Sequence, residues 1–182
     1  MKLVLLPDHN PATKGWMQDL ALLLKGHADS VSIYHYDHGH SSKPLDETSE
    51  LLKIRETVVH EPFIFIGTSF GVTLALTAIK KGIRPRACVF IGSPLRTKEE
   101  DISELPALLQ NYNVPTLFIQ AMDDPYGSSV ELAQLIKQKN ISATIHTARS
   151  NGHEYGDLEE LGTLISAFIV EQSDKPLKKK TI

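Results

Sequence analysis

Short apolar runs alternate along the chain with longer stretches in which apolar residues recur every three or four positions. Apolar runs of about four to eight residues are typical of buried strands, and the wider spacing is typical of helices with one apolar face. We therefore expect strands at residues 2–6, 29–36, 62–66, 86–92, 115–121 and 141–147. We expect helices at residues 12–25, 46–60, 70–81, 104–111, 128–139 and 157–171.

This alternation predicts an α/β fold. Parallel strands need long crossover connections, and helices in those connections cover both faces of the sheet. Residues 1–172 should therefore form one domain around a six-stranded, mostly parallel sheet. Residues 173–182 include three consecutive lysines and are expected to form a flexible basic tail.

Composition narrows the classes of partner. The chain has 182 residues with a net charge of -3, so no positive excess attracts nucleic acid or an anionic membrane. No apolar run approaches the roughly 18 residues of a membrane span. The N-terminal apolar run ends at Pro7 and is too short for a signal peptide, and the lone cysteine, Cys88, fits a buried core position. We expect a cytoplasmic protein, and the pattern favours no particular oligomeric state.

The segment 63–71 carries the strongest chemical signal. An apolar strand runs into Gly67-Thr-Ser69-Phe70-Gly71, and a helical pattern follows directly. Gly-x-Ser-x-Gly between a strand and a helix is typical of a nucleophile elbow, in which a sharp turn exposes the serine hydroxyl. The alternative is a glycine-rich strand-to-helix turn with Ser69 as an ordinary helix cap.

A nucleophilic serine needs a base, and that base needs an acid to orient it. His153 follows the last predicted strand, and Asp123 and Asp124 follow the fifth. In a parallel sheet the carboxyl ends of the strands meet at one edge, so these side chains should converge with Ser69. The residues leave either aspartate open as the acid, since one of them would only initiate the turn.

These features together resemble the α/β-hydrolase superfamily, in a small form without a cap domain. The marks are the Gly-Thr-Ser-Phe-Gly elbow, the Asp-Asp-Pro turn and Gly152-His153, and the resemblance covers residues 3–170. It implies the sheet order 2-1-3-4-5-6, without two N-terminal strands of larger members. It also implies Ser69 as nucleophile, His153 as base and Asp124 as acid, with Asp123 as the second choice.

The resemblance further implies an oxyanion hole formed by two backbone N–H groups. One belongs to Phe70, and the other belongs to the loop after the first strand, where His9 is the matching residue and Asn10 the alternative. Asp8 stands where relatives carry glycine. A carboxylate there is unfavourable beside a developing oxyanion unless it points away.

We interpret the chain as a serine hydrolase that cleaves a small-molecule carboxylic ester or thioester through an acyl-enzyme on Ser69. No cofactor and no metal are expected. Only residues 93–114 connect the fourth and fifth strands, so the pocket should be open. Four large side chains in the predicted loops are candidates to line it: Trp16, Met122, Tyr126 and Tyr155.

Two alternatives remain. The histidines at positions 35, 38 and 40 could bind a metal, but this region resembles a turn found after the same strand in many α/β hydrolases, which favours a tight turn. The fold could also serve a non-catalytic binding or scaffold protein, because a fold does not fix a function.

Overall fold

The computed structural model describes all residues except 11–12, 37–45, 59–60, 97–103, 151 and 176–182. Six strands form one sheet in the order β2-β1-β3-β4-β5-β6, and all five pairings are parallel. The predicted order is confirmed. The strands are β1 (Lys2–Leu6), β2 (Ser30–Ile33), β3 (Phe63–Thr68), β4 (Ala87–Ile91), β5 (Thr116–Ala121) and β6 (Ala143–Ala148).

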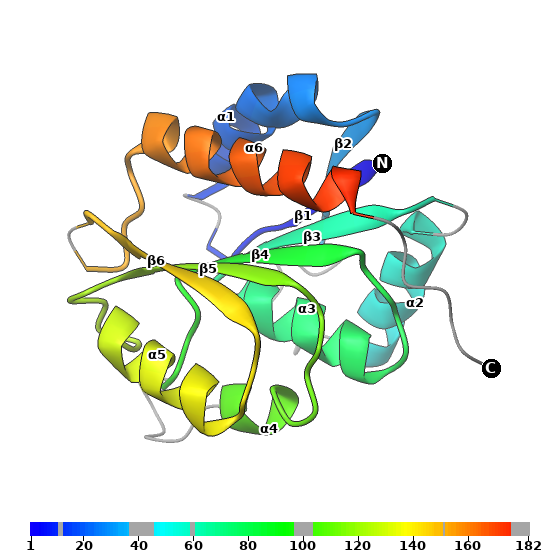
Figure 1. Ribbon diagram of the computed structural model, residues 1–182. Coiled ribbons are helices and arrows are strands. Elements are labelled where there is room, and N and C mark those ends of the chain that lie inside the picture. The colour runs from blue at the N-terminus through cyan, green and yellow to red at the C-terminus, as the bar shows by residue number, and fades with distance from the viewer. Residues whose placement is uncertain (11–12, 37–45, 59–60, 97–103, 151, 176–182) are drawn as a thin grey trace.

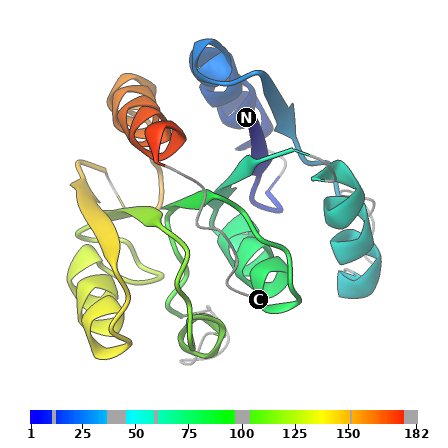
Figure 2. The same ribbon diagram turned by 45° about the vertical axis from the view of Figure 1, so that its right-hand side comes forward.

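Helices cover both faces of the sheet (Figure 1). On one face lie α1 (Lys14–Leu24), the 3-10 turn η2 (Lys25–His27) and α6 (Leu158–Asp174). On the other lie α2 (Glu47–Thr57), α3 (Phe70–Lys80), α4 (Leu105–Leu108) and α5 (Ser129–Gln138). Figure 2 shows the same three layers from a second direction.

Two apolar cores follow from this layering. β3 and β4 are buried at every position, as strands must be when helices cover both faces. Their alternate side chains divide between the cores: Phe65 and Phe90 face the α2–α5 side, whereas Ile66 and Val89 face α1 and α6. At one edge of the sheet, β6 is only partly buried.

Element boundaries differ from the expected ones mainly at the ends. The second strand ends at Ile33, three residues earlier than expected. Beyond it, the Tyr36 hydroxyl donates a hydrogen bond to the Pro7 carbonyl at 2.6 Å. α6 runs three residues past the expected end, because the Arg86 side chain donates to the carbonyls of Gln172 and Ser173. The expected tail thus begins helical, and residues 176–182 lie outside the described part.

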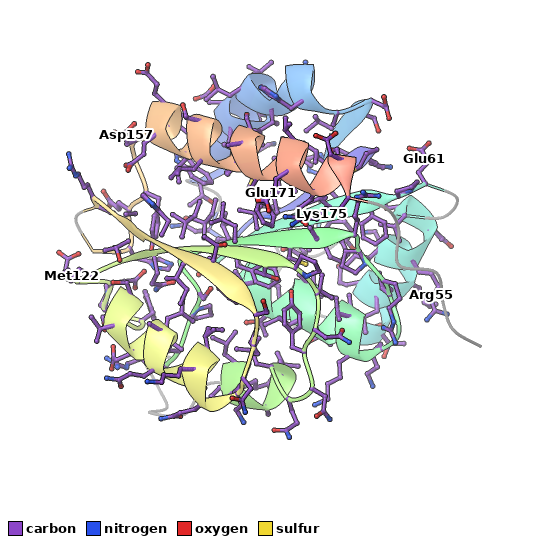
Figure 3. All side chains as sticks on the ribbon, viewed as in Figure 1. Arg55, Glu61, Met122, Asp157, Glu171 and Lys175 are labelled. Carbon is purple, nitrogen blue, oxygen red and sulfur yellow. The ribbon has the colours of Figure 1, made fainter. Side chains whose placement is uncertain are left out.

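Charged side chains lie at the C-terminal end of α6, as Figure 3 shows. Lys175 follows the last residue of α6, and its ammonium group lies 2.7 Å from a carboxylate oxygen of Glu171. At the opposite end, Asp157 caps α6 by accepting from the Glu160 N–H at 2.9 Å. The cap at Asp157 starts α6 shortly after the loop that carries His153.

Candidate active site

Ser69 lies at a sharp turn between β3 and α3. Its backbone has φ 49° and ψ -114°, a conformation that costs a non-glycine residue about 1–3 kcal/mol. Two backbone bonds hold the turn: the Ser69 N–H donates to the Ile91 carbonyl at 3.1 Å, and the Val72 N–H donates to the Ser69 carbonyl at 3.0 Å. Strain of this kind persists only where the surroundings impose it.

Two glycines make the turn sterically feasible. A Cβ on Gly71 would lie 1.9 Å from the Leu6 carbonyl oxygen, and one on Gly67 would lie 2.9 Å from the Gly71 backbone. Both contacts are shorter than real Cβ contacts allow, so α3 approaches β1 and β3 only because side chains are absent there. This packing supplies the reason for the Gly-x-Ser-x-Gly spacing.

Asp124 and His153 meet at the carboxyl ends of β5 and β6. The Nδ1 atom of His153 lies 2.8 Å from Oδ2 of Asp124. The Asp124 side chain is fully buried, whereas the His153 side chain keeps 23% of its surface exposed. A carboxylate only accepts hydrogen bonds, so this contact keeps the imidazole proton on Nδ1 and leaves Nε2 as an acceptor.

The Asp124 carboxylate is bound by further donors. Its Oδ1 accepts from the Tyr126 N–H at 2.9 Å, and its Oδ2 accepts from the Tyr155 hydroxyl at 2.8 Å and the Gln120 amide at 3.3 Å. Asp123 instead accepts from the Gly152 N–H at 3.3 Å, in the loop that precedes His153. Of the two aspartates in the turn, the one that contacts His153 is therefore Asp124.

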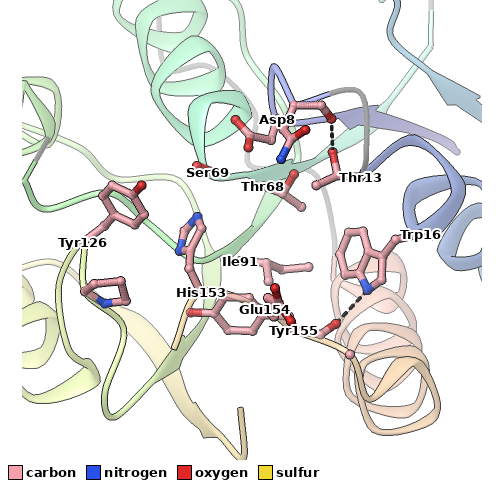
Figure 4. Close-up of a pocket in the computed structure, with 13 residues that line it drawn as sticks. Asp8, Thr13, Trp16, Thr68, Ser69, Ile91, Tyr126, His153, Glu154 and Tyr155 are labelled. Carbon is pink, nitrogen blue, oxygen red and sulfur yellow. Dashed lines mark hydrogen bonds between the residues drawn. The ribbon is translucent and has the colours of Figure 1, made fainter. Parts of the chain in front are cut away.

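A cleft of about 670 Å³ opens beside these residues (Figure 4). Ser69 and His153 both line it, and the indole of Trp16 forms part of its wall. The residues around the cleft come from the ends of β3 and β4, from the start of α1 and from the loops after β1, β3, β5 and β6: Asp8, Asn10, Thr13, Trp16, Thr68, Ser69, Ile91, Pro125, Tyr126, His153, Glu154, Tyr155 and Gly156.

The loop after β1 is arranged differently from expectation. The His9 N–H, the expected second oxyanion donor, donates to the carboxylate of Asp8 at 2.7 Å. Asp8 and Asn10 line the cleft, whereas the His9 ring packs 3.7 Å from the Phe70 ring, centroid to centroid. Burial lowers the pKa of His9, and the negative charges of Asp8 and Glu50 oppose that effect.

Three of the four candidate pocket residues reach the cleft: Trp16, Tyr126 and Tyr155. Met122 is 65% exposed and is not among the lining residues; Figure 3 shows it at the edge of the molecule. Gln120, a fully buried amide bonded to Asp124, was not predicted from the sequence. The available signal was a polar residue near the end of a mostly apolar strand.

The remaining residues concern a possible metal site, a membrane span and the lone cysteine. His38 and His40 lie outside the described residues, and the carbonyl of His35 accepts from Lys53. Among the residues described, no group of three side chains is placed to hold a metal ion, and no helix could cross a bilayer. Cys88 is fully buried in β4, and burial raises the pKa of its thiol to about 12.

Comparison with known proteins rests on structure alone, because no family model and no curated protein matches the sequence. Est1E from Butyrivibrio proteoclasticus, solved with ferulic acid bound, is 13% identical with a TM-score of 0.71, over 96% of this chain and 90% of Est1E. The type II thioesterase BorB of the borrelidin biosynthetic cluster is 22% identical with a TM-score of 0.65, over 94% of this chain and 90% of BorB.

Mouse alpha/beta hydrolase domain-containing protein 10 is 14% identical with a TM-score of 0.66, over 93% of this chain and 90% of that protein. Between β4 and β5, the only element in the described residues is the four-residue α4, so those residues contain no cap domain. Identities this low establish the fold alone, and the chain accordingly has the fold of the α/β hydrolases.

Proposed function

We propose that the protein is a serine hydrolase that cleaves a carboxylic ester or thioester through an acyl-enzyme on Ser69. One observation carries the proposal: the buried carboxylate of Asp124 lies 2.8 Å from His153, and His153 lines the same cleft as a serine with a strained backbone. Backbone strain costs free energy and is retained where a function needs it, and the acid that orients the base of a nucleophilic serine is itself buried and hydrogen-bonded to the imidazole.

In the proposed reaction, Nε2 of His153 takes the proton of the Ser69 hydroxyl as Oγ attacks the substrate carbonyl carbon. Asp124 holds the imidazole in the required tautomer and stabilises its positive charge. The tetrahedral intermediate collapses, the C–O or C–S bond breaks, and the leaving alcohol or thiol takes the proton from Nε2. Water then attacks the acyl-enzyme with His153 again acting as base, which releases the acid and regenerates Ser69.

The oxyanion would be bound by two backbone N–H groups. Phe70 is the first residue of α3, where N–H groups have no partner within the helix and the dipole favours negative charge. The second donor would be the N–H of His9, and the substrate oxygen must then displace the carboxylate of Asp8 from it. Asn10, which also lines the cleft, is the alternative donor.

The cleft indicates the substrate class. Aromatic side chains of Trp16, Tyr126 and Tyr155 form its apolar surface, and the described residues that line it include no lysine or arginine. Such a surface suits a small, uncharged acyl group better than a phosphorylated or carboxylated one. The similar structures include one with ferulic acid bound and one thioesterase, in line with an ester or thioester substrate.

The test is a series of p-nitrophenyl esters and acyl-CoA thioesters of increasing chain length. We expect the wild-type protein to prefer short acyl groups, and Ser69→Ala to lower kcat by about four orders of magnitude. Ser32→Ala, which alters a half-buried serine in β2, should leave kcat unchanged. A fluorophosphonate probe should label the wild type and Ser32→Ala but not Ser69→Ala.

Wild-type protein that neither hydrolyses any ester nor reacts with the probe would contradict the proposal. That result would favour a non-catalytic binding or scaffold role for the cleft. A Ser69→Ala variant with undiminished activity would equally contradict the role of Ser69.

A further inference from the structure

Tyr155 contributes two separate groups to the site. Its ring lines the cleft beside His153 (Figure 4), and its hydroxyl donates to Oδ2 of Asp124, the oxygen that also contacts His153. We propose that Tyr155 is a positioning residue whose hydroxyl holds the Asp124 carboxylate in place. Tyr155 and His153 then both interact with the negative charge of that carboxylate. The expected effect on kcat rests on the proposed function. The expected effect of the Tyr155 hydroxyl on Asp124 and His153 does not.

The direction of the two hydrogen bonds at the Tyr155 hydroxyl is fixed. The Ala121 N–H donates to the hydroxyl oxygen at 3.0 Å, so that oxygen is the acceptor in this contact. The hydroxyl proton is then available for Asp124, whose Oδ2 lies 2.8 Å away and, when ionised, only accepts. Tyr155 thus connects the last residue of β5 to the side chain three positions later.

The hydroxyl remains a donor throughout the working pH range. Burial raises the pKa of Tyr155 well above its ordinary value, and the nearby charges of Asp124 and Asp123 raise it further. The hydrogen bond from Ala121 has the opposite, smaller effect. A phenol that stays protonated keeps the same hydrogen bond to the carboxylate whether His153 is neutral or charged.

Tyr155 is contacted at its ring and at its backbone. A Cβ at Gly92, where φ is 61°, would lie 2.9 Å from Cε2 of Tyr155 and 2.9 Å from Cε1 of His153, so both rings rest against this bare backbone. The indole N–H of Trp16 donates to the backbone carbonyl of Tyr155 at 2.7 Å. The backbone that follows β4 therefore limits the position of the ring, and Trp16 of α1 holds the Tyr155 backbone.

Loss of the hydroxyl would leave the carboxylate less constrained. Oδ2 would keep only His153 and the longer 3.3 Å contact from Gln120, while Oδ1 would keep the Tyr126 N–H. The negative charge would then concentrate on the imidazole side, which stabilises the charged form of His153. The imidazole would also be held less firmly toward Ser69.

The experiment compares Tyr155→Phe with Tyr112→Phe. Tyr112 is a matched control, because it is also buried and its hydroxyl also forms a hydrogen bond, at 2.5 Å to Thr116, remote from the cleft. For Tyr155→Phe we expect kcat about tenfold lower with KM within about twofold, and the acid limb of the pH–rate profile at higher pH. Tyr112→Phe should change neither.

An independent measurement needs no activity. The NMR titration of the His153 imidazole, assigned with His153→Gln, should have its midpoint at higher pH in Tyr155→Phe by roughly half a pH unit. Site-specific 3-fluorotyrosine at position 155 keeps the hydroxyl and makes it a stronger donor, so the midpoint should move to lower pH. This second variant also carries the test if Tyr155→Phe does not fold.

The outcomes separate the two proposals. Wild-type protein without hydrolytic activity would overturn the proposed function, and the His153 titration would still test Tyr155. A His153 midpoint that is the same in the wild type and in both variants at position 155 would overturn the positioning role. An unchanged kcat in Tyr155→Phe, in an active wild-type enzyme, would overturn its kinetic consequence.

Discussion

The two sides of the cleft are built in contrasting ways. On the β5–β6 side, the buried carboxylate of Asp124 receives four hydrogen bonds and is already oriented toward His153. On the β1 side, the N–H of His9 is occupied by the neighbouring carboxylate of Asp8, in a loop that is partly exposed. For the proposed reaction, the first side is already arranged for proton transfer, whereas on the second side the His9 N–H would have to leave Asp8 before it could bind an oxyanion.

This contrast indicates which groups would have to reorganise during the proposed reaction. Preorganised groups need no reorganisation during a reaction, so they lower the barrier most effectively. A donor that is already occupied must first lose its partner, and a hydrogen bond to a charged group is worth about 1.5–3 kcal/mol. We therefore expect substitutions on the β5–β6 side to reduce activity, and removal of the Asp8 carboxylate to increase it.

The largest effect is expected at Asp124. In Asp124→Asn the side chain can no longer accept from His153, Tyr155 and Tyr126 with a full negative charge, so kcat should fall by about three to four orders of magnitude. Steady-state kinetics with p-nitrophenyl acetate measure this. Asp123→Asn is the matched control and should lower kcat less than about fivefold; equal losses in both variants would contradict the assignment.

Gly71→Ala should break the β1 side of the cleft. The new methyl group would meet the carbonyl oxygens of Leu6 and Pro7, at 1.9 Å and 3.0 Å, and would force α3 away from the loop that follows β1. Urea denaturation should show a loss of about 3 kcal/mol in the free energy of unfolding. Gly15→Ala, in open space on α1, should instead raise it by about 0.5 kcal/mol.

Substitution of Asp8 should sharpen the contrast. Asp8→Ala frees the His9 N–H and removes a negative charge from the cleft, so kcat for uncharged esters should rise about tenfold. Asp8→Asn keeps an acceptor without the charge, so its gain should be smaller. Kinetics of both variants at one pH measure this series, and a decrease in kcat for Asp8→Ala would show that the carboxylate assists the reaction.

The smallest effect concerns His9. Because burial lowers the pKa of His9, the unfolded chain takes up this proton more readily than the folded one as the pH falls. The resulting contribution to stability is present above pH 6.5, the ordinary histidine value, and is lost progressively below it. His9→Phe keeps the ring contact with Phe70, and its melting temperature should fall less between pH 7.5 and 5.5. An equal fall in both proteins would contradict this.

Much of the fold could be predicted from the sequence because its signals are local. Apolar runs and helical spacing predicted all six strands, because strands covered on both faces are apolar throughout. Their order was predicted only from the resemblance to the α/β hydrolases. Boundaries were less accurate because tertiary contacts decide them. The extension of α6 depends on Arg86, a residue 86 positions away from its partner Gln172.

The candidate site was predictable only in part. Ser69 and His153 are marked by neighbouring glycines and by their positions after strands, and they do line one cleft. Asp123 and Asp124 are adjacent, so the backbone path of the turn decides which of them contacts His153. The hydroxyl of Tyr155 and the carboxylate of Asp8 depend on side-chain rotamers, which no local pattern encodes.

The position of Trp16 has a practical consequence. It is the single tryptophan of the chain, its indole N–H is bonded to the Tyr155 carbonyl, and its ring lines the cleft. Its intrinsic fluorescence therefore originates at the candidate site, without interference from other indoles. For the proposed acyl-enzyme reaction, stopped-flow emission would follow acylation and deacylation separately in unlabelled protein.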